Sequence, residues 1–334
     1  METAGALPAI RGCKKPSVNP PAHKTCWIIG RRNGVGLEQD AALVARALSE
    51  AGWQVACHGP RDFGKLLNPL SQVDVIIHLE RVFPLWKLKG GRHFLIPNQE
   101  RFPTRHLGRL KRIDQILCKS RHAEEIFSKH HPVVKYIGFT SEDRGTGDQP
   151  DYSRFFHLAG KSTLKNTSLL LDLWSRHPEW PRLTIVQHPD NAPAAVPGNV
   201  DLVSRYLPDG ELRKLQNACG IHLCPSLSEG WGHYIVEAMS CRAVTVVTDA
   251  PPMNELVDSS RGIVVPFHRS EPRHLGQNFH ADPARLEEAI TRLISESAES
   301  KQRLGNAARS WFEKNQSEFT MRVARILSDL GNQT

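Results

Sequence analysis

Short apolar runs alternate along the chain with longer stretches in which apolar residues recur at helical spacing. An apolar run at 25–30 leads through a glycine-containing loop into a predicted helix at 37–52, and a second apolar run follows at 53–59. These three segments form a strand–helix–strand unit. Further strands are predicted at 73–79, 92–98, 115–120 and 133–139. Strands that alternate with helices indicate a parallel, doubly wound α/β sheet.

A second alternating series follows a break in this pattern. Residues 141–153 are polar and contain glycine and proline, which predicts a linker between two domains. Apolar runs return at 154–160, and later strands are predicted at 182–187, 200–207, 221–225 and 243–249. Two Rossmann-like halves that face each other leave a central cleft, and such domain junctions are preferred ligand sites.

The domain boundaries follow from these breaks. We expect a flexible leader at 1–23, an N-terminal Rossmann-like domain at 24–140 and a C-terminal Rossmann-like domain at 154–310. Helical spacing continues to the end of the chain, so residues 311–334 are predicted to form a final helix in which Trp311 is a packing residue.

Composition limits the classes of protein that fit. With 334 residues, of which 40% are hydrophobic, the chain can bury two cores. Its seven cysteines form no CxxC pair and several fall inside predicted strands, which indicates reduced thiols in a cytoplasmic protein. No Cys/His spacing typical of a metal site occurs, and no apolar run reaches the roughly 18 residues of a membrane span. We therefore expect neither a metal nor a cofactor.

The net charge of +8 indicates an acidic partner. A nucleotide, an anionic acceptor and an anionic membrane surface all fit this charge, and a solvated basic face is the alternative. The densest basic run, at 105–112, contains no interleaved aromatic residues, so we expect no nucleic-acid partner. A cytoplasmic location, or a peripheral one at the inner membrane face, follows from this interpretation.

A pair of glutamates follows the predicted strand at 221–225. A loop rich in small residues leaves this strand, and a helical stretch begins near His233. In parallel sheets, ligands bind where loops leave the carboxyl ends of strands and helices begin. Glu229 lies in that loop and Glu237 about one turn into the helix, so both carboxylates are predicted to face one crevice.

Each part of this crevice has a chemical use. Gly230 and Gly232 flank Trp231 and let the backbone approach a ligand, while the free N–H groups of a helix start attract phosphate. The two acceptor oxygens of Glu237 suit the paired hydroxyls of a ribose. Glu229 can hold the hydroxyls of a second sugar or stabilise positive charge at its anomeric carbon. The alternative is that both carboxylates are solvated and bind no ligand. The apolar neighbours of Glu237 disfavour this alternative for that residue, because a charge without a partner is costly among apolar side chains.

Two lysines follow the strand at 154–160. Lys161 and Lys165 would face the same cleft as Glu229, and two cations there suit a diphosphate whose negative charge rises as it leaves. Lysines in a loop are otherwise usually solvated, which is the alternative interpretation.

A weaker signal follows the first strand. Gly34 and Gly36 resemble the start of a dinucleotide fingerprint, but Gln39 occupies the position of the third glycine. A nicotinamide cofactor is therefore not expected.

The run SEGWGHYIVEAM, followed by a strand and an aspartate, resembles the retaining glycosyltransferases of the GT-B fold, family 4, or glycosyl transferases group 1. That family carries two glutamates separated by seven residues and a basic pair after the first strand of its C-terminal domain. Gly160, Lys161 and Lys165 are similar to that basic pair, with Lys in place of Arg. The resemblance is strong at 154–265 and weaker in the N-terminal half. It implies two Rossmann-like, doubly wound domains that face a central cleft, with C-terminal helices crossing back to the N-terminal domain.

The resemblance also implies roles for individual residues. It implies that Lys161 and Lys165 bind the donor diphosphate and that Glu229 contacts the donor sugar. By the same resemblance, Glu237 holds the nucleotide ribose. The remaining positions of the family's donor site correspond to Gly230, Trp231, Gly232 and His233, whose backbone approaches sugar and phosphate, and to Gly34 and Gly36, near the diphosphate and acceptor.

The chain departs from the family's pattern at several positions. Asn166 and Arg242 stand where glycine is usual, and the run PNQER takes the place of a histidine often found in the N-terminal domain. We expect Asn98, Gln99 and Glu100 of that run to approach the acceptor.

The resemblance implies an enzyme that moves a sugar from a nucleotide-diphosphate donor to an acceptor, with retention of anomeric configuration and without a metal. The acceptor stays open; an anionic or membrane-associated one fits the charge. The alternative is a degenerate GT-B protein that binds a sugar or nucleotide without turnover, and a sugar phosphorylase is a neighbouring class of enzyme.

Overall fold

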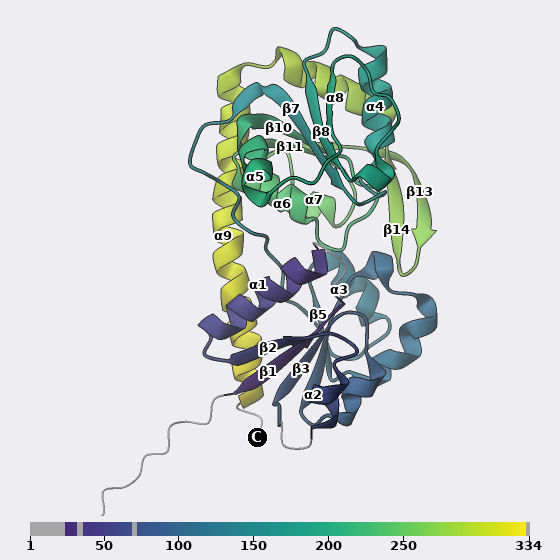
Figure 1. The fold of residues 1–334 in the computed structure, drawn as a ribbon, viewed down its shortest axis with the longest axis vertical. Helices are drawn as coiled ribbons and strands as arrows, with labels where there is room; N and C mark the ends of the chain where they lie inside the picture. The colour runs from purple at the N-terminus through teal and green to yellow at the C-terminus, as the bar shows by residue number, and fades with distance from the viewer. Residues whose placement is uncertain (1–23, 32–35, 69–71, 332–334) are drawn as a thin grey trace, which may run out of the picture.

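A computed structural model describes residues 24–31, 36–68 and 72–331, with the side chains of 24–31, 36–68 and 72–326. Two six-stranded sheets, each flanked by helices, form two lobes stacked along the long axis of the molecule (Figure 1). The predicted leader at 1–23 and the predicted glycine position Gly34 lie outside the described residues. Within the described part of the chain, no helix is long and apolar enough to cross a lipid bilayer.

The N-terminal lobe contains a parallel sheet in the order β2-β1-β3-β4-β5-β6. Its strands fall at the apolar runs, because strands buried on both faces read as continuous apolar segments. The strands are β1 (Thr25–Ile29), β2 (Gln54–His58), β3 (Val75–Glu80), β4 (Arg92–Pro97), β5 (Gln115–Cys118) and β6 (Val134–Tyr136). The helices are α1 (Gly36–Glu50), α2 (Phe63–Leu67) and α3 (Arg121–Ser128), with 3₁₀ turns η1 (Pro84–Leu88), η2 (Gln99–Arg101) and η3 (Thr104–Arg112).

The C-terminal lobe repeats this architecture in the order β12-β11-β10-β7-β8-β9. Its strands are also parallel, as predicted for a doubly wound sheet. The strands are β7 (Asp151–Gly160), β8 (Leu183–Gln187), β9 (Val200–Val203), β10 (Cys219–Cys224), β11 (Val244–Thr248) and β12 (Ile263–Val265). The helices are α4 (Thr167–Arg176), α5 (Asp209–Ala218), α6 (His233–Ser240), α7 (Met253–Leu256) and α8 (Pro283–Ser295), with the 3₁₀ turn η4 (Pro189–Asn191).

A two-stranded antiparallel hairpin, β13 (Phe267–Arg273) and β14 (Gly276–Ala281), projects beside the C-terminal lobe (Figure 1). The sequence pattern does not predict it, because β13 is exposed along nearly its whole length and therefore lacks an apolar alternation. Its tip reaches the other lobe: β14 contacts η2, and Leu275 packs against the apolar cluster around Phe102.

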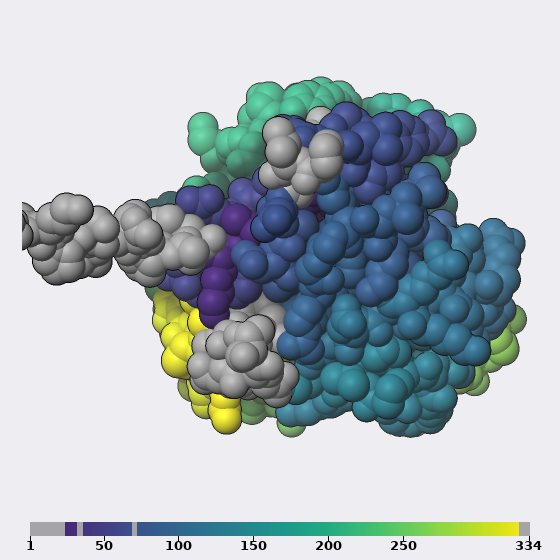
Figure 2. Space-filling model, turned by 90° about the horizontal axis from the view of Figure 1, so that it is seen from below, coloured from purple at the N-terminus to yellow at the C-terminus, as the bar shows by residue number. Residues whose placement is uncertain are grey.

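The last helix, α9 (Ala298–Gly331), joins the two lobes. It contacts α6, β7 and β11 of the C-terminal lobe and α1 of the N-terminal lobe. Phe312 and Phe319 are fully buried in a single apolar cluster to which both lobes contribute, and Trp311 packs against that cluster. Seen from below, the N-terminal lobe forms most of the surface, with the yellow end of α9 at its margin (Figure 2). The helix therefore connects the two lobes through a shared apolar core.

Two positions at which the sequence resemblance would place glycine adopt left-handed backbone angles. Asn166 has φ 59° and Arg242 has φ 58°. Asparagine tolerates this region, whereas arginine carries a strain of about 1 kcal/mol or more there. The phenol of Tyr152 donates a hydrogen bond to the Arg242 carbonyl (2.9 Å) and helps to hold that turn. Both departures therefore keep a glycine-like backbone.

Candidate functional site

The site is built where the order of strands in the C-terminal sheet reverses. β7 pairs with β8 on one side and with β10 on the other, so the loops that leave β7 and β10 diverge onto opposite faces and open a crevice between them. One backbone hydrogen bond, from Leu227 N–H to the Leu164 carbonyl (2.9 Å), ties these loops together. The residues after β7 and β10 are thereby brought side by side.

Lys165 and Glu229 meet at this point. The Lys165 Nζ donates to Glu229 Oε1 at 2.5 Å, and the two side chains are only 14% and 13% exposed. The ammonium also lies 3.5 Å from the centre of the Tyr234 ring. Ser226 donates to the same Glu229 oxygen (2.5 Å) and contacts the Tyr234 hydroxyl. These contacts hold the Lys165 ammonium and the Glu229 carboxylate in fixed positions, largely shielded from solvent.

Lys161 lies elsewhere. Its side chain is 72% exposed and pairs with Asp190 at 3.4 Å. The structure thus does not bring it to Lys165 and Glu229, although the two lysines are four residues apart in the sequence. The strand ends at Gly160, whose φ of 54° turns the chain, and Lys161 is left on the outer side of the loop.

Glu237 projects from α6 toward two amides. Gln39 of α1 donates to one of its oxygens (2.8 Å) and Gln216 of α5 to the other (3.2 Å). Each carboxylate oxygen retains a second lone pair, so paired hydroxyls of a ligand can still be accepted. The sequence pattern identifies Gln39 only as the residue that breaks a dinucleotide fingerprint, and it gives no signal for Gln216.

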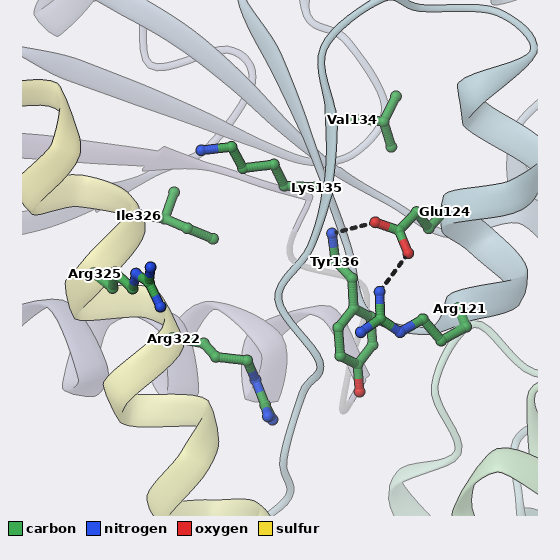
Figure 3. Close-up of a pocket in the computed structure, with 8 residues that line it drawn as sticks. All are labelled: Arg121, Glu124, Val134, Lys135, Tyr136, Arg322, Arg325 and Ile326. Atoms are coloured by element: carbon green, nitrogen blue, oxygen red, sulfur yellow. Dashed lines mark hydrogen bonds and ion pairs between the residues drawn. The ribbon is translucent and has the colours of Figure 1, made fainter. Parts of the chain in front are cut away.

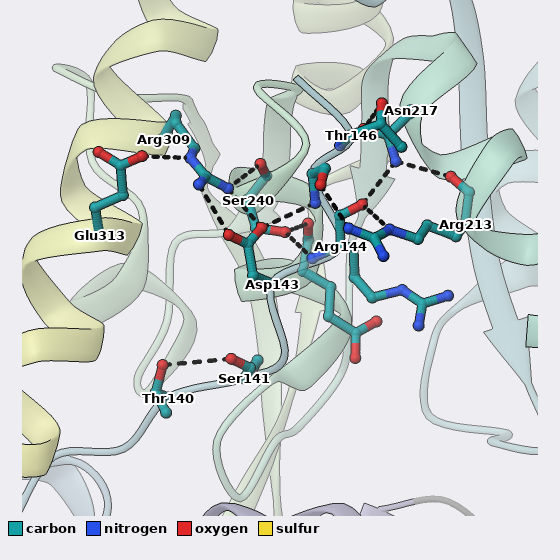
Figure 4. A network of polar contacts seen from close by, with 12 residues as sticks. Thr140, Ser141, Asp143, Arg144, Thr146, Arg213, Asn217, Ser240, Arg309 and Glu313 are labelled. Atoms are coloured by element: carbon teal, nitrogen blue, oxygen red, sulfur yellow. Dashed lines mark hydrogen bonds and ion pairs between the residues drawn. The ribbon is translucent and has the colours of Figure 1, made fainter. Parts of the chain in front are cut away.

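The segment between the lobes, which includes Arg144 (Figure 4), orients Gln216. Arg144 is buried and donates through Nε to Gln216 Oε1 (2.9 Å), which leaves the amide N–H group of Gln216 facing Glu237. Arg144 also pairs with Asp209 (2.6 Å), and its own carbonyl accepts from Arg213 and Asn217. This part of the predicted linker is therefore attached to the C-terminal lobe, and it forms the wall behind Glu237.

A second ion-pair network joins the two lobes. Asp40 of α1 accepts from Lys119 (2.5 Å) and from His233 Nε2 (2.9 Å), and His233 Nδ1 contacts the Ser141 hydroxyl (2.9 Å). Burial opposes the ionisation of Asp40, but the neighbouring charge of Lys119 and the hydrogen bond from His233 outweigh it and hold the Asp40 pKa below its ordinary value. The network joins both lobes at the start of α6.

The Asp40 network is absent from the sequence prediction, yet a signal for it exists. Asp40 shares the buried face of α1 with Leu37, Val44 and Ala47. A charged residue on the apolar face of a helix needs a partner, because an unpaired buried charge is costly. Lys119, directly after the apolar β5, carries the same signal.

The run after β4 faces Glu229 from the other lobe. Gln99 donates from its side chain to the Glu229 carbonyl (2.8 Å). A Cβ added at Gly230 would lie 2.7 Å from the Asn98 side chain, so only glycine allows this approach. The acceptor-side candidates Asn98, Gln99 and Glu100 are thus placed against the Glu229 loop.

Several buried polar atoms of this surface make no hydrogen bond within the part of the chain that is described. They are Asn98 Oδ1, Gln99 Oε1, Glu100 Oε2 and Trp231 Nε1. Buried polar atoms normally have partners, and a group of unpaired ones where the two lobes meet indicates a place for a polar ligand. The predicted site residue Trp231 is otherwise a core residue, packed edge-on against Phe139.

The predicted glycine positions Gly232 and Gly36 differ in backbone conformation and in surroundings. Gly232 adopts φ 108° directly before α6, which L side chains rarely do, so glycine is required there. Gly36 is the exposed first residue of α1, with open space where a side chain would project. Among the described residues, no group of three His, Cys, Asp or Glu side chains is placed to hold a metal ion.

Comparisons with known proteins support the C-terminal part of this site most directly. Residues 197–311 match the model of the family Glycosyl transferases group 1. Alpha-maltose-1-phosphate synthase of Mycolicibacterium smegmatis is 24% identical over 169 residues. The matched stretch is 50% of this chain and 40% of that relative, so the chain spans less than half of the relative's length.

Solved structures match over nearly the whole chain. A glycosyltransferase from Rickettsia africae superposes with a TM-score of 0.69 at 12% identity and covers 92% of this chain and 98% of its own. HepE from Anabaena, solved with UDP and glucose, superposes with a TM-score of 0.68 at 13% identity and covers 93% and 100%. At these identities the likeness concerns the fold.

Proposed function

We propose that this chain, whose fold is GT-B and whose residues 197–311 belong to the glycosyl transferases group 1, transfers a sugar from a nucleotide-diphosphate donor to an acceptor. The observation that carries the proposal is the pairing of Lys165 with Glu229 at the switch point of the C-terminal sheet, where the Glu229 loop leads into α6, the helix that carries Glu237. HepE, which shares the fold, was solved with UDP and glucose, and this supports a nucleotide sugar as the donor.

Each donor-side residue has a distinct role in the proposal. Lys165 and the N–H groups at the start of α6 stabilise the charge that builds on the leaving diphosphate, which needs no metal. Glu229 holds the donor sugar, and Glu237 accepts the hydroxyls of the ribose. Because Lys165 is already aligned and largely dry, little reorganisation is needed when the charge develops.

We infer that transfer proceeds with retention. The acceptor hydroxyl then attacks from the face that the diphosphate leaves, and the departing phosphate takes its proton. No side chain is assigned as the base. Closure of the two lobes over the donor would exclude the water that otherwise hydrolyses it. The anomeric configuration of the product, measured by NMR during turnover, tests this part separately.

The acceptor side favours an anionic acceptor. The hairpin tip lies over η2: a Cβ added at Gly276 would be 3.4 Å from Gln99. Burial lowers the pKa of His274 at this tip, and so do the positive charges of its neighbours. These neighbours are Arg273, Arg81, Arg101 and Arg105. An acceptor that carries a phosphate, either free or on a membrane lipid at the cytoplasmic face, would satisfy them.

The first experiment is a thermal-shift screen of nucleotide diphosphates and nucleotide sugars, followed by a turnover assay. A ligand at 100 times its dissociation constant adds about 2.7 kcal/mol of stability, enough to rank the bases. Binding together with turnover supports the proposal. Binding without transfer or hydrolysis would instead favour a degenerate GT-B binding protein, and no stabilisation by any nucleotide would refute the donor site.

Glu100 gives a pH-dependent prediction. Burial, reinforced by the nearby charge of Glu229, raises the pKa of Glu100 to about 7. Between pH 4.5, the ordinary pKa of a glutamate, and about 7, Glu100 is therefore protonated in the folded state and ionised in the unfolded state. The stability that the protonated carboxyl group contributes is present at low pH and is lost as the pH rises through about 7. We expect Glu100→Gln to flatten the fall in unfolding free energy between pH 5 and 8, measured in urea. The exposed Glu288→Gln is the control and should leave that slope unchanged.

A further inference from the structure

Two groups of paired polar side chains lie outside the contact between Lys165 and Glu229. One group lines a pocket between α3, β6 and the last turns of α9 (Figure 3). Its pairs are local: Glu124 accepts from Arg121 Nη1 (2.7 Å) and from the Tyr136 N–H (2.9 Å), and these bonds connect α3 with β6. The other group ends at Glu237, the carboxylate to which the proposed function gives the ribose.

Gln216 of α5 lies between a cation and this carboxylate. Its Oε1 accepts from Arg144 Nε (2.9 Å), and its Nε2 donates to Glu237 Oε2 (3.2 Å). A guanidinium group has only donors and an ionised carboxylate only acceptors, so a side chain that bonds to both needs one acceptor and one donor. An amide has both, and Arg144 determines which end of the amide faces Glu237.

Arg144 is itself immobile, because both its side chain and its backbone are bonded (Figure 4). Its Nη1 donates to Asp209 (2.6 Å), its backbone N–H donates to the Ser240 hydroxyl (2.9 Å), and its carbonyl accepts from Asn217 (2.8 Å). Arg144 is 6% exposed and Gln216 only 1%. Gln216 therefore acts on a ligand only through Glu237.

The two amides at Glu237 differ in origin. Gln39 belongs to α1 of the N-terminal lobe, so its bond to Glu237 (2.8 Å) requires contact between the lobes. Gln216 belongs to the same lobe as Glu237, and its backbone carbonyl lies 2.9 Å from the ring Nε2 of His222 in β10. The bond from Gln216 thus does not depend on how the lobes are arranged.

We propose that Gln216 is a positioning residue for the donor nucleotide, which carries the fixed place of Arg144 to Glu237 and sets the direction in which this carboxylate accepts the ribose hydroxyls. This inference rests on the proposed function. Two neighbouring hydroxyls bond to one carboxylate only if its plane is turned toward both. Because Gln216 turns it before the nucleotide arrives, less ordering is left to the binding step.

The test variant is Gln216→Glu. It keeps the shape of the side chain and the acceptor for Arg144, but it removes the donor and places a second carboxylate against Glu237. We expect the Kd for a nucleotide sugar to rise about tenfold at pH 7.5, the loss of one hydrogen bond to a charged group. The donor KM should rise to a similar degree while kcat stays unchanged, since the ribose is bound equally before and during the reaction. Calorimetric titration with UDP-glucose, ADP-glucose and GDP-mannose and initial rates of donor turnover measure these changes.

Lowering the pH should repair the variant. Two adjacent carboxylates take up a proton more readily than one, and below the apparent pKa of the pair the shared proton again gives Glu237 a donor. The Kd of Gln216→Glu should therefore fall toward the wild-type value between pH 8 and 5.5. The diphosphate of a nucleotide sugar has no terminal phosphate group, so the probe itself does not titrate in this range.

The neighbouring groups do not produce this signature. Burial lowers the pKa of His222 to about 4, so its ring is neutral throughout, and burial raises the pKa of the Cys241 thiol beside Glu237 to about 12. Asp209 pairs with Arg144 in both proteins. The wild-type protein, titrated over the same range, accounts for every other group, including His233 at the start of α6.

Gln302→Glu is the matched control. The Gln302 amide also donates to a side-chain oxygen, that of Gln149 (3.2 Å), but it lies near the start of α9 and has no contact with Glu237. The control should leave Kd, KM and their pH dependence unchanged. Urea unfolding of both variants shows whether the fold is retained.

The outcomes separate this role from the proposed function. A wild-type protein that binds none of the three nucleotide sugars would overturn the proposed function, and the role of Gln216 with it. Wild-type binding that Gln216→Glu leaves unchanged would overturn the role of Gln216 alone. A defect in kcat without one in KM, or a weakened binding that persists at pH 5.5, would also overturn it.

Discussion

Replacing Lys165 by alanine is expected to lower kcat for sugar transfer by about 10²- to 10³-fold, because it removes the aligned cation that stabilises the leaving diphosphate. The Lys165 side chain is 14% exposed and its Nζ lies 2.5 Å from Glu229 Oε1, so the charge is largely shielded from water and interacts more strongly than it would in bulk solvent. Glu229→Ala should lower kcat to a similar degree, because it removes the contact to the donor sugar. Initial rates at saturating donor and acceptor measure both effects.

Two lysine variants show whether the loss belongs to this position. Lys161→Ala should have a much smaller effect, since that side chain is 72% exposed beside Asp190 and its charge is screened by water. Lys314→Ala, 78% exposed on α9, should have none. Normal donor turnover in both Lys165→Ala and Glu229→Ala would refute the assignment of the site, and a large loss in Lys161→Ala would show that the β7 loop rearranges when the donor binds.

Replacing Asp40 by alanine is expected to destabilise the fold by about 3 to 5 kcal/mol, because it leaves Lys119 as a buried cation without its partner. The side chains of Asp40 and Lys119 are 4% and 3% exposed. The change also removes the contact to His233, so the two lobes lose a polar link at the start of α6. Urea unfolding at pH 7 measures the free-energy difference.

An exposed ion pair provides the matched control. Arg182 and Asp201 also meet at 2.5 Å, but their side chains are 66% and 50% exposed. Asp201→Ala should therefore change stability by about 1 kcal/mol or less. Equal effects of Asp40→Ala and Asp201→Ala would show that burial adds nothing to the Asp40 network.

The effect of Asp40→Ala should depend on pH in a defined direction. The folded-state pKa of Asp40 lies below the ordinary value of 3.8, since Lys119 and His233 outweigh the effect of burial. Its stabilisation is therefore present above that value and is lost as the pH falls through the lowered pKa. The difference between the wild-type protein and Asp40→Ala should shrink in acid, and a difference that grows there would contradict the ion-pair assignment.

The sheets could be predicted because their central strands are buried on both faces. Runs such as 25–30 and 221–225 are continuous and apolar, so their strands are visible in the sequence itself. The hairpin at 267–281 is not predicted for two reasons. The first strand, β13, is exposed and has no apolar face, and the second, β14, is largely buried but reads GQNFHA, in which few of the buried residues are strongly apolar.

The candidate donor site is predictable in part because parallel sheets place the loops after their strands at one edge. That rule predicts that Lys165 and Glu229 lie close together, and their side chains are paired in the structure. It could not separate Lys161 from Lys165, since the turn at Gly160 decides which lysine points inward. A side chain's direction in a loop depends on backbone angles that residue type alone does not fix.

The sequence by itself determined the two α/β lobes, the place of the crevice in the C-terminal lobe and the carboxylates predicted to line it. Each of these depends on buried strands and on the order of strands, loops and helices, which leave local patterns in the sequence. Only the tertiary structure decided how the lobes meet. The contacts of Gln39 with Glu237, of Asp40 with His233 and of Gln99 with the Glu229 loop join residues 130 to 198 positions apart. Such pairs form where two surfaces dock, and no regular spacing along the sequence predicts them.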